Sequence, residues 1–222
     1  MTRVLIVGAG GHGHVVADAL ICSRREGSDL EAVGFVDDDP SLEGATIMGL
    51  PVLGSTARLG RVDHDAVFVA IGDNVSRAQL FGRLVAAGER VVTIVHPRAV
   101  VAATARVGSG VLVCAGAVVN AAAVLGDNAI VNTGATVDHH CILGAHSHIA
   151  PGAHLGGGVE VGEGSLLGIA SAVVPGRRVG RWCVVGAGAV VTRDLPDRVT
   201  AVGAPARIVR RHPSDQKHQA RS

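Results

Sequence analysis

The feature that most constrains this chain is an apolar residue at every sixth position over a long stretch. From Val101 to Val191, positions spaced by six are all Val, Leu or Ile. The residue two places earlier is usually small, and glycine often follows the aliphatic residue. This period fits neither an amphipathic helix nor an alternating strand, but it is typical of a parallel β-helix of hexapeptide repeats. Three hexads make one coil of roughly 18 residues, so the repeat predicts about five coils.

The first hundred residues follow a different pattern, in which short apolar runs alternate with helical periodicity. Strands are predicted over 3–7, 32–36, 66–71 and 91–95, and helices over 13–23 and 75–87. Strands that alternate with helices are typical of a small parallel α/β sheet. We therefore expect an α/β Rossmann-like domain over 1–98, a β-helix over 99–204, and a C-terminal segment with a disordered tail over 205–222.

Composition argues against several functional classes. The formal net charge is +1 and aromatic residues make up 2% of the chain, so we expect no nucleic-acid partner and no membrane partner. Apolar runs end well before the ~20 residues of a membrane span, and the first residues are typical of a strand rather than a signal peptide. The four cysteines are widely spaced, which favours reduced thiols in a cytoplasmic protein over a disulfide or zinc set.

A glycine-rich motif joins the first predicted strand to the first predicted helix. Gly8, Gly10 and Gly13 have the G-x-G-x-x-G spacing, in which backbone N–H groups at a helix N-terminus hold a pyrophosphate. A dinucleotide-binding domain is one interpretation, with Asp37 as the acid that binds the ribose. The α/β region is too short for both halves of such a domain, which favours the phosphates of a nucleotide-linked sugar instead.

Polar residues follow the second and third predicted strands, at the edge where open α/β sheets bind ligands. We place Asp37 and Asp38 near the base or ribose of the nucleotide, and a solvated turn is the alternative for Asp38. Asn74 and Arg77 are candidate nucleotide contacts. Helix capping by Asp73 or Asn74 is the alternative there.

Histidine is dense in one part of the repeat, where five histidines fall within residues 139–154. A zinc site is one explanation, but the spacing differs from that of the zinc-binding γ-type carbonic anhydrases, and we expect no metal. An imidazole with an ordinary pKa near 6.5 suits a general base at neutral pH. Asn120 and Asn132 follow aliphatic positions and face outward, where they either contact sugar hydroxyls or form a structural ladder.

Four stretches together resemble the bacterial sugar O-acyltransferases of the sialic-acid O-acetyltransferase type. They are residues 7–13 (VGAGGHG), 34–38 (GFVDD), 70–74 (AIGDN) with Arg77, and 131–139 (VNTGATVDH). Within that family, the chain is most similar to members that acetylate the amine of nucleotide-linked 4-amino sugars. The resemblance covers nearly the whole chain, from residue 3 to residue 207.

The resemblance implies a left-handed β-helix, a homotrimer, and acetyl-CoA bound along the β-helix between subunits. It implies that the N-terminal domain binds the sugar nucleotide, with Gly10, Gly11 and His12 in the phosphate loop. His139 then stands at the position of the general base, and His148 near the acceptor or the thioester. The residues implied for acetyl-CoA are His148, Gly152, Ala170 and Arg207, with a solvated role as the alternative for Arg207.

The activity expected from this resemblance is N-acetyl transfer from acetyl-CoA to a nucleotide-linked amino sugar. Three alternatives remain from the sequence: O-acetyl transfer to a sialic-acid-like sugar, an NAD-dependent oxidoreductase, and an inactive scaffold that binds sugar nucleotides. The sequence does not distinguish UDP, GDP and dTDP as the nucleotide.

One position departs from the family pattern. An acidic residue usually follows the base there, whereas this chain has Asp138-His139-His140. Adjacent residues of a strand point to opposite faces, so we do not expect Asp138 to pair with the ring of His139. We expect His139 to remain the base and His140 to position substrate or a water molecule.

Overall fold

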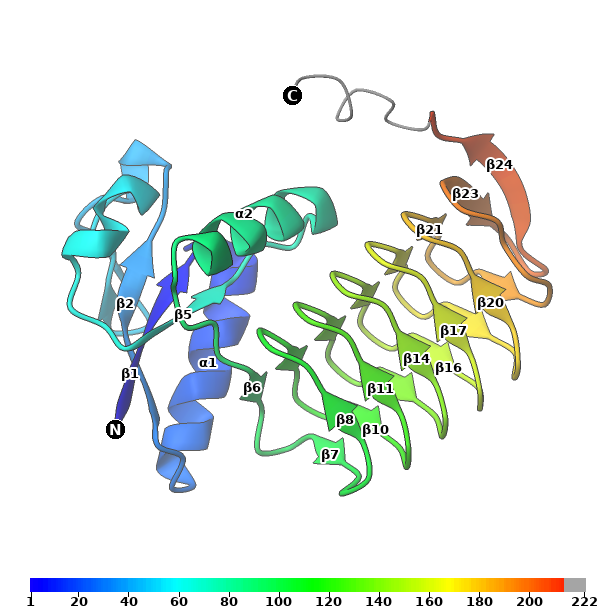
Figure 1. The fold of residues 1–222 in the computed structure, drawn as a ribbon, viewed down its shortest axis with the longest axis horizontal. Helices are drawn as coiled ribbons and strands as arrows, with labels where there is room; N and C mark the ends of the chain where they lie inside the picture. Colours follow the sequence, from blue (N-terminus) through cyan, green and yellow to red (C-terminus); the bar gives the residue numbers. More distant parts are fainter. Residues whose placement is uncertain (214–222) are drawn as a thin grey trace.

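The computed structural model describes residues 1–213, which form an α/β domain followed by a β-solenoid (Figure 1). This confirms the predicted fold class. Strands β1 (Thr2–Val7), β2 (Leu30–Val36) and β5 (Ala66–Val69) form a parallel sheet in the order β2-β1-β5. The helices are α1 (Gly11–Arg25) and α2 (Asn74–Ala86). Four short elements lie between β2 and β5: η1 (Pro40–Leu42), β3 (Thr46–Ile47), β4 (Leu50–Pro51) and η2 (Thr56–Arg61).

The central strand β1 explains why the α/β domain has three layers. Its residues from Val4 to Val7 are fully buried, as expected of a parallel strand covered on both faces. Val4 and Ile6 belong to the apolar cluster that contains α1, whereas Leu5 and Val7 belong to the cluster that contains α2. Successive side chains of a strand point to opposite faces, so β1 supplies both halves of the core.

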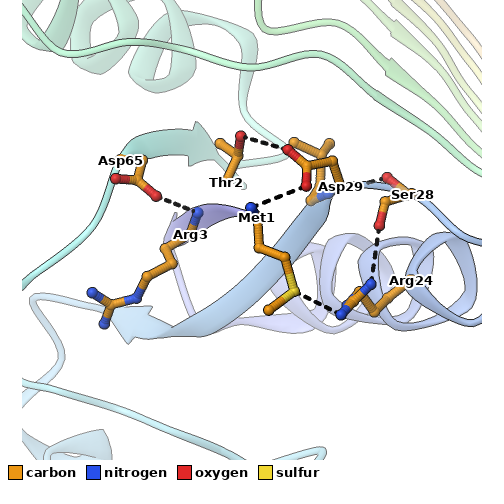
Figure 2. Close-up of polar contacts among 8 residues, drawn as sticks. Met1, Thr2, Arg3, Arg24, Ser28, Asp29 and Asp65 are labelled. Atoms are coloured by element: carbon orange, nitrogen blue, oxygen red, sulfur yellow. Dashed lines mark hydrogen bonds and ion pairs between the residues drawn. The ribbon is translucent and has the colours of Figure 1, made fainter.

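The amino end of the sheet is held by exposed polar contacts (Figure 2). The Met1 ammonium group lies 3.1 Å from the Asp29 carboxylate, and the hydroxyl of Thr2 donates to the same carboxylate (3.3 Å). The backbone N–H of Arg3 donates to Asp65 (2.8 Å). These contacts lie at the end of the sheet opposite the phosphate loop, so the carboxyl edge is left to a ligand.

The solenoid has three parallel faces, which we number by the order in which the hexads reach them. Face 1 contains β7 (Val100–Val101), β10 (Val118–Val119), β13 (Thr136–Val137), β16 (His154–Leu155), β19 (Ala172–Val173) and β22 (Val190–Val191). Face 2 contains β8 (Arg106–Val107), β11 (Val124–Leu125), β14 (Ile142–Leu143), β17 (Glu160–Val161) and β20 (Arg178–Val179). Face 3 contains β6 (Ile94–Val95), β9 (Leu112–Val113), β12 (Ile130–Val131), β15 (His148–Ile149), β18 (Leu166–Leu167), β21 (Val184–Val185), β23 (Val199–Val202) and β24 (Arg207–Arg211).

The six-residue period is confirmed by how these strands pair. Val119 pairs with Val137 in the next coil, and Val137 pairs with Leu155. These aliphatic side chains fill the interior, and the small residues two places earlier, such as Ala135, are also fully buried. Face 1 has six strands, so the solenoid has about six turns rather than the five predicted. The hexad count missed β6 at one end and Leu195, which pairs with Val179, at the other.

The domains share their apolar core, because the α/β domain covers the outer side of face 3. Leu112 and Ile130 point away from the solenoid interior and lie in one cluster with Val16 and Leu20 of α1. The strand predicted over 91–95 is divided between the two parts. Val91 bridges to Val67 of the α/β sheet, whereas β6 pairs with β9 of the solenoid. The solenoid therefore begins before residue 99, where the sequence places the domain boundary.

The C-terminal segment is not a simple tail in the part that the structure describes. β23 pairs with β24 in antiparallel register, so the chain folds back on face 3 after residue 204. The predicted disordered tail falls mostly on residues 214–222, which lie outside the described residues. All four cysteines are free thiols. Within residues 1–213, no helix has the length and apolar character needed to cross a bilayer.

Candidate active site

A cavity of about 500 Å³ lies at the carboxyl edge of the α/β sheet, where α1 begins. Its wall includes the three predicted loop residues Gly10, Gly11 and His12. Gly10 is the N-cap residue of α1 and has no side chain to fill that position. The positive end of the helix dipole and the first N–H groups of α1 favour an anion at this place.

The glycines of the loop divide into two that are structural and two that face open space. A Cβ at Gly13 would lie 2.3 Å from the carbonyl oxygen of Gly8, and a Cβ at Gly8 would lie 2.8 Å from that of Ala70. A Cβ at Gly10 or Gly11 would meet nothing within 4 Å. The first pair therefore lets α1 approach the sheet, and the second pair leaves room for phosphates.

Asp37 and Asp38 line this cavity as predicted, but their carboxylates already have partners. Asp37 accepts the backbone N–H groups of Ala9 (2.7 Å) and Asp39 (2.9 Å). Asp38 accepts both the N–H and the hydroxyl of Thr56 (each 2.8 Å). These bonds hold the loops that form the wall, and the lone pairs that remain on the oxygens are what a ribose or base would meet.

Asn74 and Arg77, predicted as nucleotide contacts, do not line the cavity and bind the solenoid instead. Arg77 is 1% exposed, and its guanidinium donates to the carbonyls of Asn128 (3.3 Å) and His146 (2.8 Å) on the solenoid. Asn74 donates to the carbonyl of Gly164 (2.9 Å). Both residues therefore fasten α2 to the corners between faces 2 and 3. Asp73 caps α2 by accepting the N–H of Ser76 (2.8 Å), as the alternative interpretation predicted.

Arg77 also reaches the cavity indirectly, through the loop that closes β5. Its Nη1 donates to the carbonyls of Ile71 (3.1 Å) and Gly72 (3.3 Å), and both of these residues line the cavity. One buried cation thus links the nucleotide-side loop to the solenoid. Burial lowers the pKa of Arg77 to about 10, so the group stays charged at neutral pH.

Two histidines meet where the cavity approaches face 3. The rings of His12 and His148 are 6.2 Å apart, and His12 Nε2 and His148 Nδ1 are buried without a hydrogen-bond partner among the described residues. Burial and then the charge of Arg77 lower the pKa of His12 to about 4. The same causes, followed by the charge of His12, lower the pKa of His148 to about 3. Both rings are therefore neutral at physiological pH.

Asn132 determines the tautomer of His148. The side-chain oxygen of Asn132 accepts the N–H of Thr133 (2.8 Å), which orients the amide so that its Nδ2 donates to His148 Nε2 (3.0 Å). The neutral His148 ring then carries its proton on Nδ1, and a backbone hydrogen bond with Gly72 partly opposes the lowering of its pKa. This tautomer makes His148 a hydrogen-bond donor through Nδ1, and the catalytic role expected for it from the resemblance stays a prediction.

The predicted base, His139, lies elsewhere, at the corner between faces 1 and 2. Its ring is exposed and lies against Gly157 of the next coil. A Cβ at Gly157 would lie 2.4 Å from the His139 ring, so only glycine leaves room for it. His139 Nδ1 lies 3.0 Å from His140 Nδ1. Asp138 accepts the backbone N–H of His139 (2.7 Å) and the amide of Asn120 (3.0 Å). The N–H of His139, followed by the bond from Asn120, holds the pKa of Asp138 below its ordinary value.

The carboxylate of Asp138 thus bonds the backbone and not the ring of His139, as expected, although the two residues lie at a corner after β13 and not within a strand. Asn120 is one member of a side-chain pair between coils, which is the structural alternative named for it. Nε2 of His139 makes no hydrogen bond within residues 1–213, so it is open to a substrate proton.

Three of the residues predicted for acetyl-CoA lie away from both the cavity and His139. Gly152 and Ala170 occupy the same corner between faces 3 and 1 in successive coils, and both have positive φ angles (64° and 54°). Arg207 is exposed on β24. None of these three residues, nor His139, lines the cavity at the phosphate loop. One chain therefore carries the predicted base and the residues predicted for acetyl-CoA at different places on the solenoid.

Sequence reasoning missed the polar face that α2 turns toward the cavity. Ser76, Gln79 and Arg83 all line it, and Thr56 closes the opposite side. The signal was present as polar residues three and four apart on a helix that begins at the carboxyl edge. Arg83 is the one arginine on this wall, and its charge favours a phosphate-bearing ligand.

The best metal-binding group within residues 1–213 is Asp18, Cys22 and His96, whose ligand atoms lie within 4.8 Å of one another. His96 Nδ1 accepts the backbone N–H of Arg98 (2.9 Å). The neutral ring must then carry its proton on Nε2, the nitrogen that faces Asp18. A metal-bound histidine instead donates from its second nitrogen. This geometry does not suit a metal ion.

The chain matches known proteins over most of its length. The family description that matches is the PglD N-terminal domain, over residues 3–84. UDP-N-acetylbacillosamine N-acetyltransferase from Bacillus subtilis is 39% identical over 117 residues, which are 52% of this chain and 52% of that relative. The match thus spans about half the length of that relative.

Two solved structures cover more of the chain. The acetyltransferase domain of PglB from Neisseria gonorrhoeae has a TM-score of 0.87 and 39% identity, over 94% of this chain and 100% of that one. PerB from Caulobacter crescentus, solved in complex with CoA and GDP-perosamine, has a TM-score of 0.86 and 43% identity, over 94% and 97%.

The fold and these similarities together identify an acetyltransferase built on a hexapeptide β-helix with an N-terminal α/β domain. The chain belongs to the PglD-type family of left-handed β-helix acetyltransferases. This confirms the resemblance stated from the sequence motifs.

Proposed function

We propose that this protein transfers the acetyl group of acetyl-CoA to the amine of a nucleotide-linked 4-amino sugar. The observation that carries the proposal is the similarity over 94% of the chain to PerB, whose structure contains CoA and GDP-perosamine. The α/β cavity fits this substrate class, because an uncapped helix N-terminus and Arg83 face the place where a diphosphate would bind. The relatives use different nucleotides, UDP in one and GDP in the other, so the nucleotide of this protein's substrate has to be measured.

The mechanism we derive uses His139 as the general base. The amine nitrogen of the sugar attacks the thioester carbonyl, so a C–N bond forms as the C–S bond breaks. Nε2 of His139 takes the proton that the nitrogen loses, and the CoA sulfur leaves as a thiolate that takes up a proton. His12, on the cavity wall, and His148 beside it stay neutral at physiological pH and act as hydrogen-bonding groups.

Replacing His139 tests this mechanism. His139→Ala is expected to lower kcat/KM by ~10²–10⁴, the usual contribution of a general base, without loss of acetyl-CoA binding. His14→Ala, an exposed histidine on α1 that does not line the phosphate-loop cavity, is the matched control and should keep full activity. Activity in His139→Ala equal to that of the control would contradict the proposed base.

The working unit we propose is a homotrimer in the cytoplasm. The support is the separation of the base, between faces 1 and 2, from Gly152 and Ala170, between faces 3 and 1. Two such corners form one site when they come from neighbouring copies. Analytical ultracentrifugation of the active protein should give a trimer, and an active monomer would contradict this arrangement.

The nucleotide is identified by titration calorimetry against UDP, GDP and dTDP. One nucleotide is expected to bind at least tenfold more tightly than the other two, about 1.4 kcal/mol of discrimination. An O-acetyltransferase acting on a sialic-acid-like sugar would instead bind none of the three and would form a base-labile ester.

A further inference from the structure

His139 and His140 are in direct contact, although they are neighbours in the chain. Their Nδ1 atoms lie 3.0 Å apart, and the rings are nearly perpendicular, with an interplanar angle of 83°. The corner conformation makes this possible. His140 has a positive φ angle of +59°, and residues at the same corner of other coils also have positive φ angles, such as Ala122 (+59°) and Gly158 (+67°). The alternation that separates neighbouring side chains on a strand does not apply to a left-handed residue.

The contact fixes how the two rings share protons. A neutral imidazole has one nitrogen that donates and one that accepts, so a bond between two Nδ1 atoms needs a proton on one of them. If His139 Nε2 is to accept the substrate proton, His139 Nδ1 must carry its own proton. His140 Nδ1 must then be the acceptor, and the proton of the His140 ring sits on Nε2.

We propose that His140 is a positioning residue that holds His139 in the tautomer needed for catalysis, in place of a carboxylate. The inference rests on the proposed function, because it assumes that His139 is the base. It differs from the expectation from sequence, which gave His140 a substrate or a water molecule as its partner. A neutral acceptor orients the base but does not neutralise the imidazolium that forms during the transfer.

The surroundings of the pair are almost free of charge. Asp138 is the charged group beside it, and its carboxylate is bonded to the backbone N–H of His139 and to Asn120. The adjoining corners are built from residues 121–122 on one side and 157–158 on the other, which are Ala and Gly. In the chain as described, no other carboxylate takes the place of the acidic residue that is usual at position 140.

Three substitutions at His140 separate its possible roles, because each tolerates a positive φ angle. His140→Gly removes the acceptor, His140→Asn supplies a neutral acceptor oxygen, and His140→Asp supplies a charged one. We measure kcat, KM and the pH profile of kcat/KM for each variant with acetyl-CoA and the sugar nucleotide. Sedimentation and acetyl-CoA binding verify that each variant is folded.

The expected order follows from the proposal. His140→Gly should lose roughly tenfold in kcat with little change in KM, and His140→Asn should recover most of that loss. His140→Asp should be at least as active as the wild type. It should also move the acid limb of its pH profile upward by about one unit, because a carboxylate favours the protonated form of a neighbouring imidazole.

Two results would overturn the inference. Equal activity of all three variants would show that His140 does not orient the base, and equal losses in His140→Gly and His140→Asn would show that the acceptor is not what matters. Neither result bears on His139. Full activity in His139→Ala would contradict the proposed base itself, so the two failures are distinguishable.

Discussion

Lowering the pH from about 7 to about 5 is expected to destabilise the protein through the buried pair His12 and His148. In the unfolded chain a histidine takes up its proton near pH 6.5. In the folded chain His12 does so near 4 and His148 near 3. Between these values the unfolded chain binds more protons, so the free energy of unfolding falls as the pH falls.

The size of this effect follows from the width of the interval. One pKa unit corresponds to about 1.4 kcal/mol, so about 1.5 units below the unfolded value reduce the free energy of unfolding by about 2 kcal/mol for each histidine. The two together give at most about 4 kcal/mol, a large share of the stability of an ordinary domain. The loss should appear first at the contact between the α/β domain and face 3, where both rings lie.

Urea unfolding at both pH values, followed by far-UV circular dichroism at fixed protein concentration, measures this loss. The variant with both His12→Gln and His148→Gln is the reference, because all other titrating groups are the same. The wild type should lose up to about 4 kcal/mol more than this double variant between the two pH values. An equal loss in the two proteins would refute the conclusion that these histidines are held neutral by burial and by Arg77.

Two further substitutions test the cavity and the domain contact. Gly10→Val should weaken sugar-nucleotide binding by ~10-fold or more and leave acetyl-CoA affinity unchanged, because the new side chain enters open space at the phosphate loop. Titration calorimetry measures both affinities, with the exposed Gly60→Val as the control. A fall in both affinities would show that Gly10 has only a structural role. Arg77→Met should lower the free energy of unfolding by about 3–5 kcal/mol, because four carbonyls lose a charged donor. Urea unfolding measures this loss, with the exposed Arg61→Met as the control. A loss no larger than that of the control would contradict the role of Arg77 in holding the two domains together.

The architecture was predictable because the repeat is simple and uninterrupted. A strict period of six determines which residues point inward, and the pairing of Val119 with Val137 and of Val137 with Leu155 follows from it. The ends were harder to predict, because β6 and Leu195 join the solenoid without a full hexad around them. Strands β1, β2 and β5 were predicted within a few residues, because strands of a covered parallel sheet form continuous apolar runs.

The site was predictable only where the backbone itself makes it. Gly10 and Gly11 face the cavity as their spacing indicates. Arg77 shows the limit, because a polar residue near a carboxyl edge suggests a ligand, whereas its partners are carbonyls that lie 51 and 69 residues away in the chain. The contact of His139 with His140 could not be predicted from the sequence either, because it depends on the left-handed backbone conformation of His140 at a corner.

The central claim is tested most directly by identifying the product of the reaction. The purified protein is incubated with acetyl-CoA and a nucleotide-linked 4-amino sugar, and the sugar nucleotide is analysed by mass spectrometry and NMR. We predict one added acetyl group, bound as an amide to the sugar nitrogen, with one free CoA released for each product. An ester on a hydroxyl, or no transfer by a protein that still binds the sugar nucleotide, would contradict the account.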